Sequence, residues 1–263
     1  MLKFLNHLKT KHYTWLVDIL ILFLLLFLFY IIGLASYPLF TPDEGRYSEI
    51  AREMFITRDY ITPRLNGIIF LDKPILHYWL QSIMISLFGI KDWSLRLLPL
   101  LSGIIGCLIT YICGLYLFDR RIALLASAIL ATSPLYFISA HYSNLDLEVA
   151  VWISASLLCF ITSMNSQTKK KVFFILMTYV FSALAVLTKG LIGIVIPLFV
   201  SFIWLVAIKR ISDLKKFHLI AGSLIFFLNG SSLVCSCTNK KSGFFLLFFY
   251  FATFFSFFFN NNF

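Results

Sequence analysis

Long apolar runs are the feature that most constrains how this chain can fold. An α-helix rises about 1.5 Å per residue, so runs of this length can cross roughly 30 Å of hydrocarbon. Helices are required there, because an unpaired backbone amide in lipid costs several kcal/mol. With 60% hydrophobic and 13% charged residues, the chain has too few polar groups for a soluble globule. The sequence therefore predicts an all-α fold, a polytopic transmembrane helix bundle. The expected spans are about 15–36, 97–118, 122–140, 146–163, 172–188, 190–208 and 217–236.

The net charge of +10 comes from basic residues that cluster in short loops between the apolar runs. These clusters lie at 119–121, 169–171 and 209–216, and further lysines precede the first run. Simple alternation of the spans puts all of them on one side, which the positive-inside rule identifies as the cytoplasm. This pattern predicts a multi-pass chain with a cytoplasmic N-terminus, with the lipid bilayer and no nucleic acid as partner.

A further apolar stretch, residues 75–90, breaks this alternation if it crosses the membrane. It is short and contains His77 and Gln81, which suits a helix lying in the interface. Residues 37–96 then form one outer loop between the first two spans, with an amphipathic helix in it. This loop faces the same compartment as the turns near 144–146 and 188–190.

The outer loop opens on a helix-start pattern. Thr41 is the expected N-cap, Pro42 the first helical residue and Glu44 the closing residue of a capping box. Glu44 either complements the helix dipole or takes part in the site. For Asp43 we favour a function, because Asp146, at the outer end of a later span, can converge on it.

Basic side chains are expected at the same outer level. Lys73, beside Asp72, lies at lipid-headgroup height, where it either snorkels to the headgroups or binds a phosphate. Arg46 and Lys189 come from other outer segments. Cations can hold a leaving phosphate while an acid takes the proton of an acceptor, which is the chemistry of sugar transfer from a phosphate. His141 either assists there or packs at the interface.

The order of several motifs is that of a known family. The chain resembles the aminoarabinose transferases of lipid A and their protein-mannosyltransferase relatives over about residues 15–225. The motifs that carry the resemblance are Thr41-Pro42-Asp43-Glu44-Gly45-Arg46-Tyr47, Arg52-Glu53-Met54, Leu65-Asn66-Gly67, Asp72-Lys73-Pro74, Tyr78-Trp79-Leu80, Arg96-Leu97-Leu98-Pro99, Leu145-Asp146 and Leu187-Thr188-Lys189-Gly190.

The resemblance implies an integral-membrane glycosyltransferase that takes its sugar from a polyprenyl-phosphate carrier. The acceptor would be lipid A, a glycan or a protein on the outer face of the inner membrane. The roles it implies are catalytic acids at Asp43 and Asp146, phosphate contacts at Arg46, Lys73 and Lys189, and secondary positions at Glu44, Asp72 and His141. The relatives usually have Glu at the position of Asp72, a site implicated in binding a divalent metal ion, so the shorter acid leaves a metal cofactor open.

The resemblance ends near residue 228, and this divides the chain into residues 1–228 and a Phe- and Asn-rich tail, 229–263. We interpret the tail as frameshifted sequence that packs poorly, and expect the chain to be an inactive fragment. Two other functions are compatible with the composition: a transporter or channel subunit, and a non-catalytic membrane scaffold. A transporter would place ionisable residues near mid-membrane, whereas here the acids gather at one face.

Overall fold

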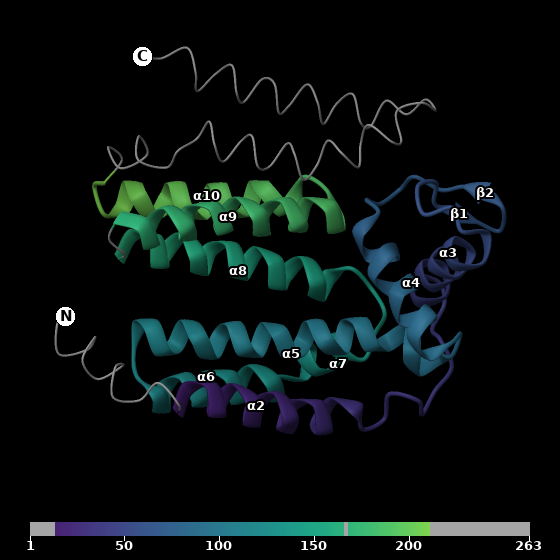
Figure 1. Cartoon of the computed structure of the whole chain (residues 1–263), viewed down its shortest axis with the longest axis horizontal. Helices are drawn as coiled ribbons and strands as arrows, with labels where there is room; N and C mark the ends of the chain where they lie inside the picture. The colour runs from purple at the N-terminus through teal and green to yellow at the C-terminus, as the bar shows by residue number, and fades with distance from the viewer. Residues whose placement is uncertain (1–13, 166–167, 211–263) are drawn as a thin grey trace, which may run out of the picture.

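The computed structural model describes residues 14–165 and 168–210 and shows long helices side by side, with short elements gathered at one end (Figure 1). This arrangement confirms the all-α fold and adds a small antiparallel hairpin of β1 and β2. In chain order the elements are α2 (Thr14–Ile31), α3 (Asp43–Thr57), β1 (Arg64–Leu65), β2 (Ile68–Ile69), α4 (Leu76–Phe88), α5 (Asp92–Leu117), α6 (Arg120–Thr132), α7 (Pro134–Ala140), α8 (Asp146–Asn165), α9 (Thr168–Lys189) and α10 (Ile192–Ala207).

The long helices correspond to the predicted membrane spans. Three of them, α5, α8 and α9, are long and apolar enough to cross a membrane by themselves. The bent pair of α6 and α7 adds a further candidate span, and α2 and α10 are shorter apolar helices. The chain is therefore a multi-pass membrane protein. The predicted span at 217–236 and the tail at 229–263 lie outside the described residues.

The turns between the spans lie at alternate ends of the bundle (Figure 1). The turn from α5 to α6, the end of α8 and the start of α9 are at the end where α2 begins. The turns from α7 to α8 and from α9 to α10 are at the opposite end, where α3, α4 and the hairpin lie. The structure thus separates the basic clusters at 119–121 and 169–171 from the predicted outer segments, as the alternation of spans requires.

The predicted span at 122–140 is not one continuous helix. It breaks at Ser133 into α6 and α7, which meet at a bend of 67°. Ser133 has an extended backbone, φ −60° and ψ 125°, because the ring of Pro134 disfavours helical geometry in the residue before it. The break leaves the Ala131 carbonyl without a helical partner, and the Tyr30 hydroxyl of α2 donates a hydrogen bond to it at 3.0 Å.

Small residues let the helices of the bundle approach closely. A Cβ on Gly114 of α5 would lie 2.6 Å from the Cα of Ala123 on α6, which is closer than real Cβ contacts allow. On the same helix, the Gly103 carbonyl accepts a hydrogen bond from Tyr136 of α7 at 2.9 Å. Backbone-to-backbone approach of this kind is typical of helix packing in lipid.

The predicted capping box at the start of α3 is wrong. The helix begins at Asp43, Pro42 occupies the N-cap position, and no side chain caps the helix. Thr41 cannot pair with Glu44 as expected, because the Glu44 carboxylate is taken by other groups, among them the backbone N–H of Phe40 at 2.8 Å.

Candidate functional site

Helix α3 packs at one end of the bundle and carries the first residues of the candidate site. Its Tyr47, Ile50 and Met54 form a buried cluster with Tyr78 of α4 and Leu145, just before α8. Asp43 and Arg46 stay partly exposed, at 44% and 32%, and form an ion pair one turn apart. The sequence pattern of α3 therefore buries one face and leaves an acid and a base on the other.

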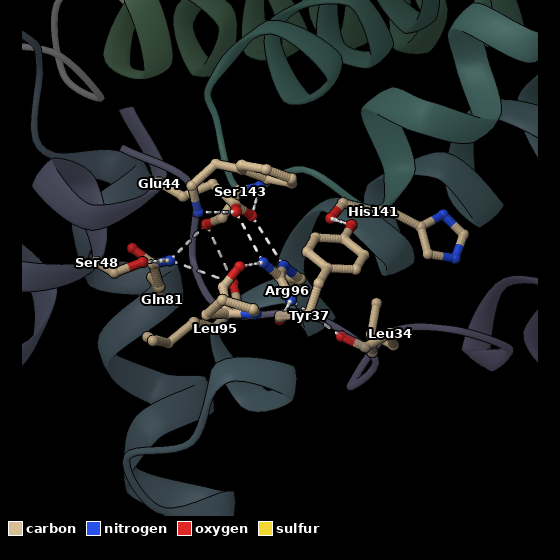
Figure 2. Close-up of polar contacts among 11 residues, drawn as sticks. Leu34, Tyr37, Glu44, Ser48, Gln81, Leu95, Arg96, His141 and Ser143 are labelled. Carbon is tan, nitrogen blue, oxygen red and sulfur yellow. Dashed lines mark hydrogen bonds and ion pairs between the residues drawn. The ribbon is translucent and has the colours of Figure 1, made fainter. Parts of the chain in front are cut away.

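A fully buried ion pair between Glu44 and Arg96 anchors this helix start (Figure 2). Arg96 Nε donates to Glu44 Oε1 at 2.9 Å, and Nη2 donates to Oε2 at 2.8 Å. The remaining N–H groups of Arg96 donate to the backbone carbonyls of Leu34, Tyr37 and Pro38 at 2.8–3.2 Å. All five donors of the guanidinium are thus used, and the Tyr37 ring covers its face at 3.9 Å.

The Glu44 carboxylate is satisfied as completely as its partner. Besides the two bonds from Arg96, it accepts hydrogen bonds from the backbone N–H groups of Phe40 and Ser143, both at 2.8 Å. Burial alone would raise the pKa of Glu44, but these hydrogen bonds outweigh it and hold the pKa below its ordinary value. Glu44 therefore ties the segment before α3 to α5 and to the loop before α8, and fixes the position of Asp43.

Four of the predicted site residues act on one phenol, that of Tyr47. Burial raises the pKa of Tyr47, and the carboxylates of Asp43 and Asp72 raise it further, whereas Arg46 and Lys73 act in the opposite direction. Arg46 also lies over the Tyr47 ring, 5.5 Å from its centroid. The structure therefore places the pairs Asp43–Arg46 and Asp72–Lys73 within electrostatic range of Tyr47.

Two further predicted residues, Asp146 and Lys189, form a second pair. Asp146, at the start of α8, is ion-paired with Lys189, at the end of α9. Lys73, which contacts Asp72 at 3.1 Å, interacts electrostatically with Lys189. The two lysines thus connect the pair to the charges around Tyr47.

The approach of Asp43 to Asp146 across a common cavity stays a prediction. Each carboxylate is held by its own cation, Asp43 by Arg46 and Asp146 by Lys189. Asp146 also lies in a local turn, where its N–H donates to Asn144 Oδ1 at 3.0 Å. What the structure places side by side is a set of alternating acids and bases.

His141 is held by backbone groups. Its Nδ1 lies 2.8 Å from the Phe137 carbonyl oxygen, and its Nε2 lies 3.2 Å from that of Ile32. Figure 2 shows the imidazole pointing away from the Glu44–Arg96 pair. This geometry favours the packing role, of the two that the sequence left open.

The described residues do not form a metal site at Asp72. Within residues 14–165 and 168–210 no three His, Cys, Asp or Glu side chains are grouped as ligands. The Asp72 carboxylate is paired with the Lys73 ammonium instead. We therefore derive no step through a metal ion.

Two buried pairs were not predicted as parts of the site. Arg96 lies within the motif Arg96-Leu97-Leu98-Pro99 that supports the resemblance. Its place near a helix end did not indicate that Glu44 is its partner. His77 and Glu148 are 71 residues apart and form a buried contact at 2.8 Å between Nδ1 and Oε1. A weak signal was present, because a histidine in an apolar stretch and an acid at a span end both need a polar partner.

Comparison with known proteins decides the family. Residues 15–234 match the family model described as dolichyl-phosphate-mannose-protein mannosyltransferase. The chain belongs to this family. Undecaprenyl phosphate-alpha-4-amino-4-deoxy-L-arabinose arabinosyl transferases are similar to it: the protein from Aeromonas hydrophila is 31% identical over 72% of the chain and 35% of its own length. The protein from Wigglesworthia glossinidia brevipalpis is 33% identical over 69% of the chain and 33% of its own length.

Solved structures of a similar protein agree with the fold. ArnT from Cupriavidus metallidurans, in a crystal structure bound to undecaprenyl phosphate, superposes with a TM-score of 0.80 at 26% identity. The match covers 88% of this chain and 42% of that protein. The apo structure of the same protein gives a TM-score of 0.79. The chain therefore spans about a third of the length of its curated relatives and shares the fold of that part.

Proposed function

We propose that this chain binds the sugar donor of a membrane glycosyltransferase. The donor is a sugar on a polyprenyl-phosphate carrier, and the acceptor is lipid A, a glycan or a protein at the outer face of a bacterial inner membrane. The observation that carries the proposal is the set of charges around Tyr47, at one end of an otherwise apolar bundle. A phosphate on a lipid tail matches both the charged group and the apolar bundle, because the phosphate can bind the cations while the tail remains in the bilayer.

The charges have complementary roles in the proposed transfer. Arg46, Lys73 and Lys189 stabilise the negative charge that develops on the carrier phosphate as its bond to the sugar breaks. Asp43 accepts the proton of the acceptor hydroxyl as the acceptor oxygen bonds to the same sugar carbon. Asp146 is the second acid.

Acids of the chain pair with the cations of this site. Each cation is neutralised by an acid of the chain, Arg46 by Asp43 and Lys189 by Asp146. A phosphate that binds these cations replaces the carboxylate partners. The released carboxylate of Asp43 is then available as a base only when the donor is bound.

The orientation of the chain is part of the proposal. The basic turns face the cytoplasm together with the N-terminus, and the site faces outward, as the charge bias of the turns requires.

Binding of undecaprenyl phosphate to the chain in lipid nanodiscs tests the proposed function. We expect undecaprenyl phosphate to bind and undecaprenol, which lacks the phosphate, to bind far more weakly. Lys73→Ala and Lys189→Ala should each weaken binding of the phosphate about tenfold or more, because hydrogen bonds to charged groups contribute roughly 1.5–3 kcal/mol.

Arg121→Ala is the matched control, because it removes a cation at the start of α6, and α6 begins at the end of the bundle opposite α3 and α4 (Figure 1). It should leave binding unchanged. Equal affinity for undecaprenyl phosphate and undecaprenol, or equal loss in all three variants, contradicts the proposal.

A further inference from the structure

A second polar group lies beneath the charges around Tyr47. His77 of α4 and Glu148 of α8 are 0% and 1% exposed and bind each other through Nδ1 and Oε1. The His77 ring meets the rings of Tyr47 and Tyr78 edge-on, at centroid distances of 5.9 Å and 5.8 Å. The pair therefore adjoins Tyr47, which also contacts Arg46 of the candidate phosphate site.

This group contains buried polar atoms that no described residue satisfies. Within the parts of the chain that the structure describes, His77 Nε2, Glu148 Oε2, Tyr78 Oη and Trp152 Nε1 have no hydrogen-bond partner. Trp152 follows Glu148 by one helical turn, so both side chains lie on one side of α8. Its indole is stacked on Phe181 of α9, which fixes the direction of its N–H.

The unsatisfied atoms define the chemistry of what they can bind. A carboxylate can only accept, so His77 Nδ1 carries a hydrogen. Nε2 accepts a hydrogen bond when the ring is neutral and donates one when the ring is protonated. Glu148 Oε2 therefore needs a donor and Trp152 Nε1 needs an acceptor. A hydroxyl group donates and accepts, so hydroxyl groups fit all three atoms.

Leaving such atoms unsatisfied in a protein interior is costly. Native proteins satisfy nearly all of them, and exceptions concentrate at binding and catalytic sites. Among the described residues the exceptions lie on α3, α4 and α8, in the part of the bundle where the predicted site residues lie (Figure 1).

We propose that His77, Glu148 and Trp152 form a subsite for the sugar of the donor, in which they bind its hydroxyl or amino groups. The subsite rests on the proposed function, because its sugar arrives on the carrier whose phosphate meets Lys73 and Lys189. Glu148 accepts a hydrogen bond from the sugar, Trp152 donates one, and His77 Nε2 bonds a hydroxyl group of the sugar. None of the three forms or breaks a bond in the transfer.

Binding of two carriers, one with the sugar and one without, distinguishes this subsite from the phosphate site. The loaded carrier is undecaprenyl phosphate-α-4-amino-4-deoxy-L-arabinose, and the unloaded carrier is undecaprenyl phosphate. Trp152→Phe removes the N–H but keeps a ring to stack on Phe181, and Glu148→Gln keeps the shape of the side chain. Each should weaken binding of the loaded carrier about three- to tenfold, the usual contribution of one hydrogen bond, and leave the unloaded carrier unchanged.

Matched substitutions elsewhere serve as controls. Trp204→Phe changes a tryptophan that packs on Phe160 in a separate cluster, and Glu49→Gln changes an acid on the exposed side of α3. Both should bind the two carriers as the unsubstituted chain does. Thermal unfolding of every variant identifies any that fail to fold. If Trp152→Phe or Glu148→Gln fails to fold, His77→Gln is tested in its place.

The outcomes distinguish this inference from the proposed function. If the variants lose no affinity, or lose it equally for both carriers, the subsite is contradicted while the phosphate site stands. If the unsubstituted chain binds neither carrier, the proposed function fails and the subsite fails with it. Loss confined to the loaded carrier supports the subsite.

Discussion

At the scale of single residues, Glu44 and Arg96 show what a buried ion pair needs in order to be tolerated. Removing two charges from water costs several kcal/mol each, and their attraction offsets this only with good geometry and full hydrogen bonding. Both conditions hold, because every donor of Arg96 has an acceptor and Glu44 accepts four hydrogen bonds. The pair therefore acts as a rigid base for the neighbouring Asp43.

The lowered pKa of Glu44 predicts how stability depends on pH. Because the pKa is lower in the folded than in the unfolded chain, ionised Glu44 stabilises the fold above its ordinary pKa of 4.5. This contribution is lost as the pH falls through the folded value. Glu44→Gln should therefore lower stability at about pH 7 by roughly 3–5 kcal/mol and flatten its decline toward about pH 4. Thermal unfolding in detergent over this range measures both effects.

Glu49→Gln provides the control for this prediction. Arg52 holds the pKa of Glu49 below its ordinary value too, but this pair is partly exposed and contributes roughly 0.2–1 kcal/mol. An equal loss in the two variants would show that burial of Glu44 has no special effect.

The sequence indicated some of these residues and could not indicate others. Asp43, Lys73 and Lys189 follow from charge at the ends of apolar runs, and the structure places them at one end of the bundle. The partners of Arg96 and His77 are distant in the sequence, and no local pattern encodes such a contact. Only the packing of α3 and α4 on the bundle end reveals them.

At the scale of elements, helix α4 buries its polar side chains and exposes its apolar ones. Its buried face carries His77, Gln81 and Ser82, and its exposed face carries Ile83 and Leu87. The polar side chains find partners inside the protein, as when Gln81 donates to Ser143 Oγ at 2.7 Å. An exposed apolar face and a length of 13 residues suit a helix on the membrane surface, as the sequence predicts.

A surface position of α4 predicts which loops are reachable from outside. Arg58→Cys, between α3 and the hairpin, should react with an impermeant thiol reagent in intact cells. Arg121→Cys should react only after the membrane is permeabilised, because α4 does not reverse the sides of later turns. Both are made in a variant without the native cysteines. Strong labelling of Arg121→Cys in intact cells would contradict the topology.

The contact of α5 with α6 allows a direct test of helix packing. Gly114→Ala places a Cβ against the Ala123 backbone, so the helices must separate, and we expect a loss of about 1–3 kcal/mol in stability. Gly45→Ala is the control, because its added Cβ meets only Thr41 Cγ2 at an ordinary 3.8 Å. That change should be neutral or stabilise α3 by up to about 1 kcal/mol. Thermal unfolding compares the two, and equal stability would contradict the close contact.

The break between α6 and α7 was missed although a signal was present. The run at 122–140 is apolar throughout, so hydropathy alone suggested one span. Ser133-Pro134 marked the boundary, because the residue before a proline is pushed out of helical geometry. Apolar composition indicates that a segment lies in lipid, but it does not indicate whether the segment is one continuous helix.

At the scale of the whole molecule, the bundle exposes apolar side chains along its edge helices. Leu20 and Leu24 of α2 and Phe199 and Phe202 of α10 are more than half exposed. A surface of this kind is expected where the neighbour is lipid. The polar and charged groups of the candidate site are instead confined to one end (Figure 1).

The hydrogen bonds of Glu44 also set an order of events during synthesis. Arg96 leaves the ribosome 52 residues after Glu44, and the Ser143 amide follows 99 residues after it. At about 5–20 residues per second, the carboxylate waits roughly 5–20 seconds for its last partner. Through that interval Glu44 lacks the contact that joins it to the loop before α8. The ribosome therefore finishes α5, α6 and α7 before the candidate site can take shape.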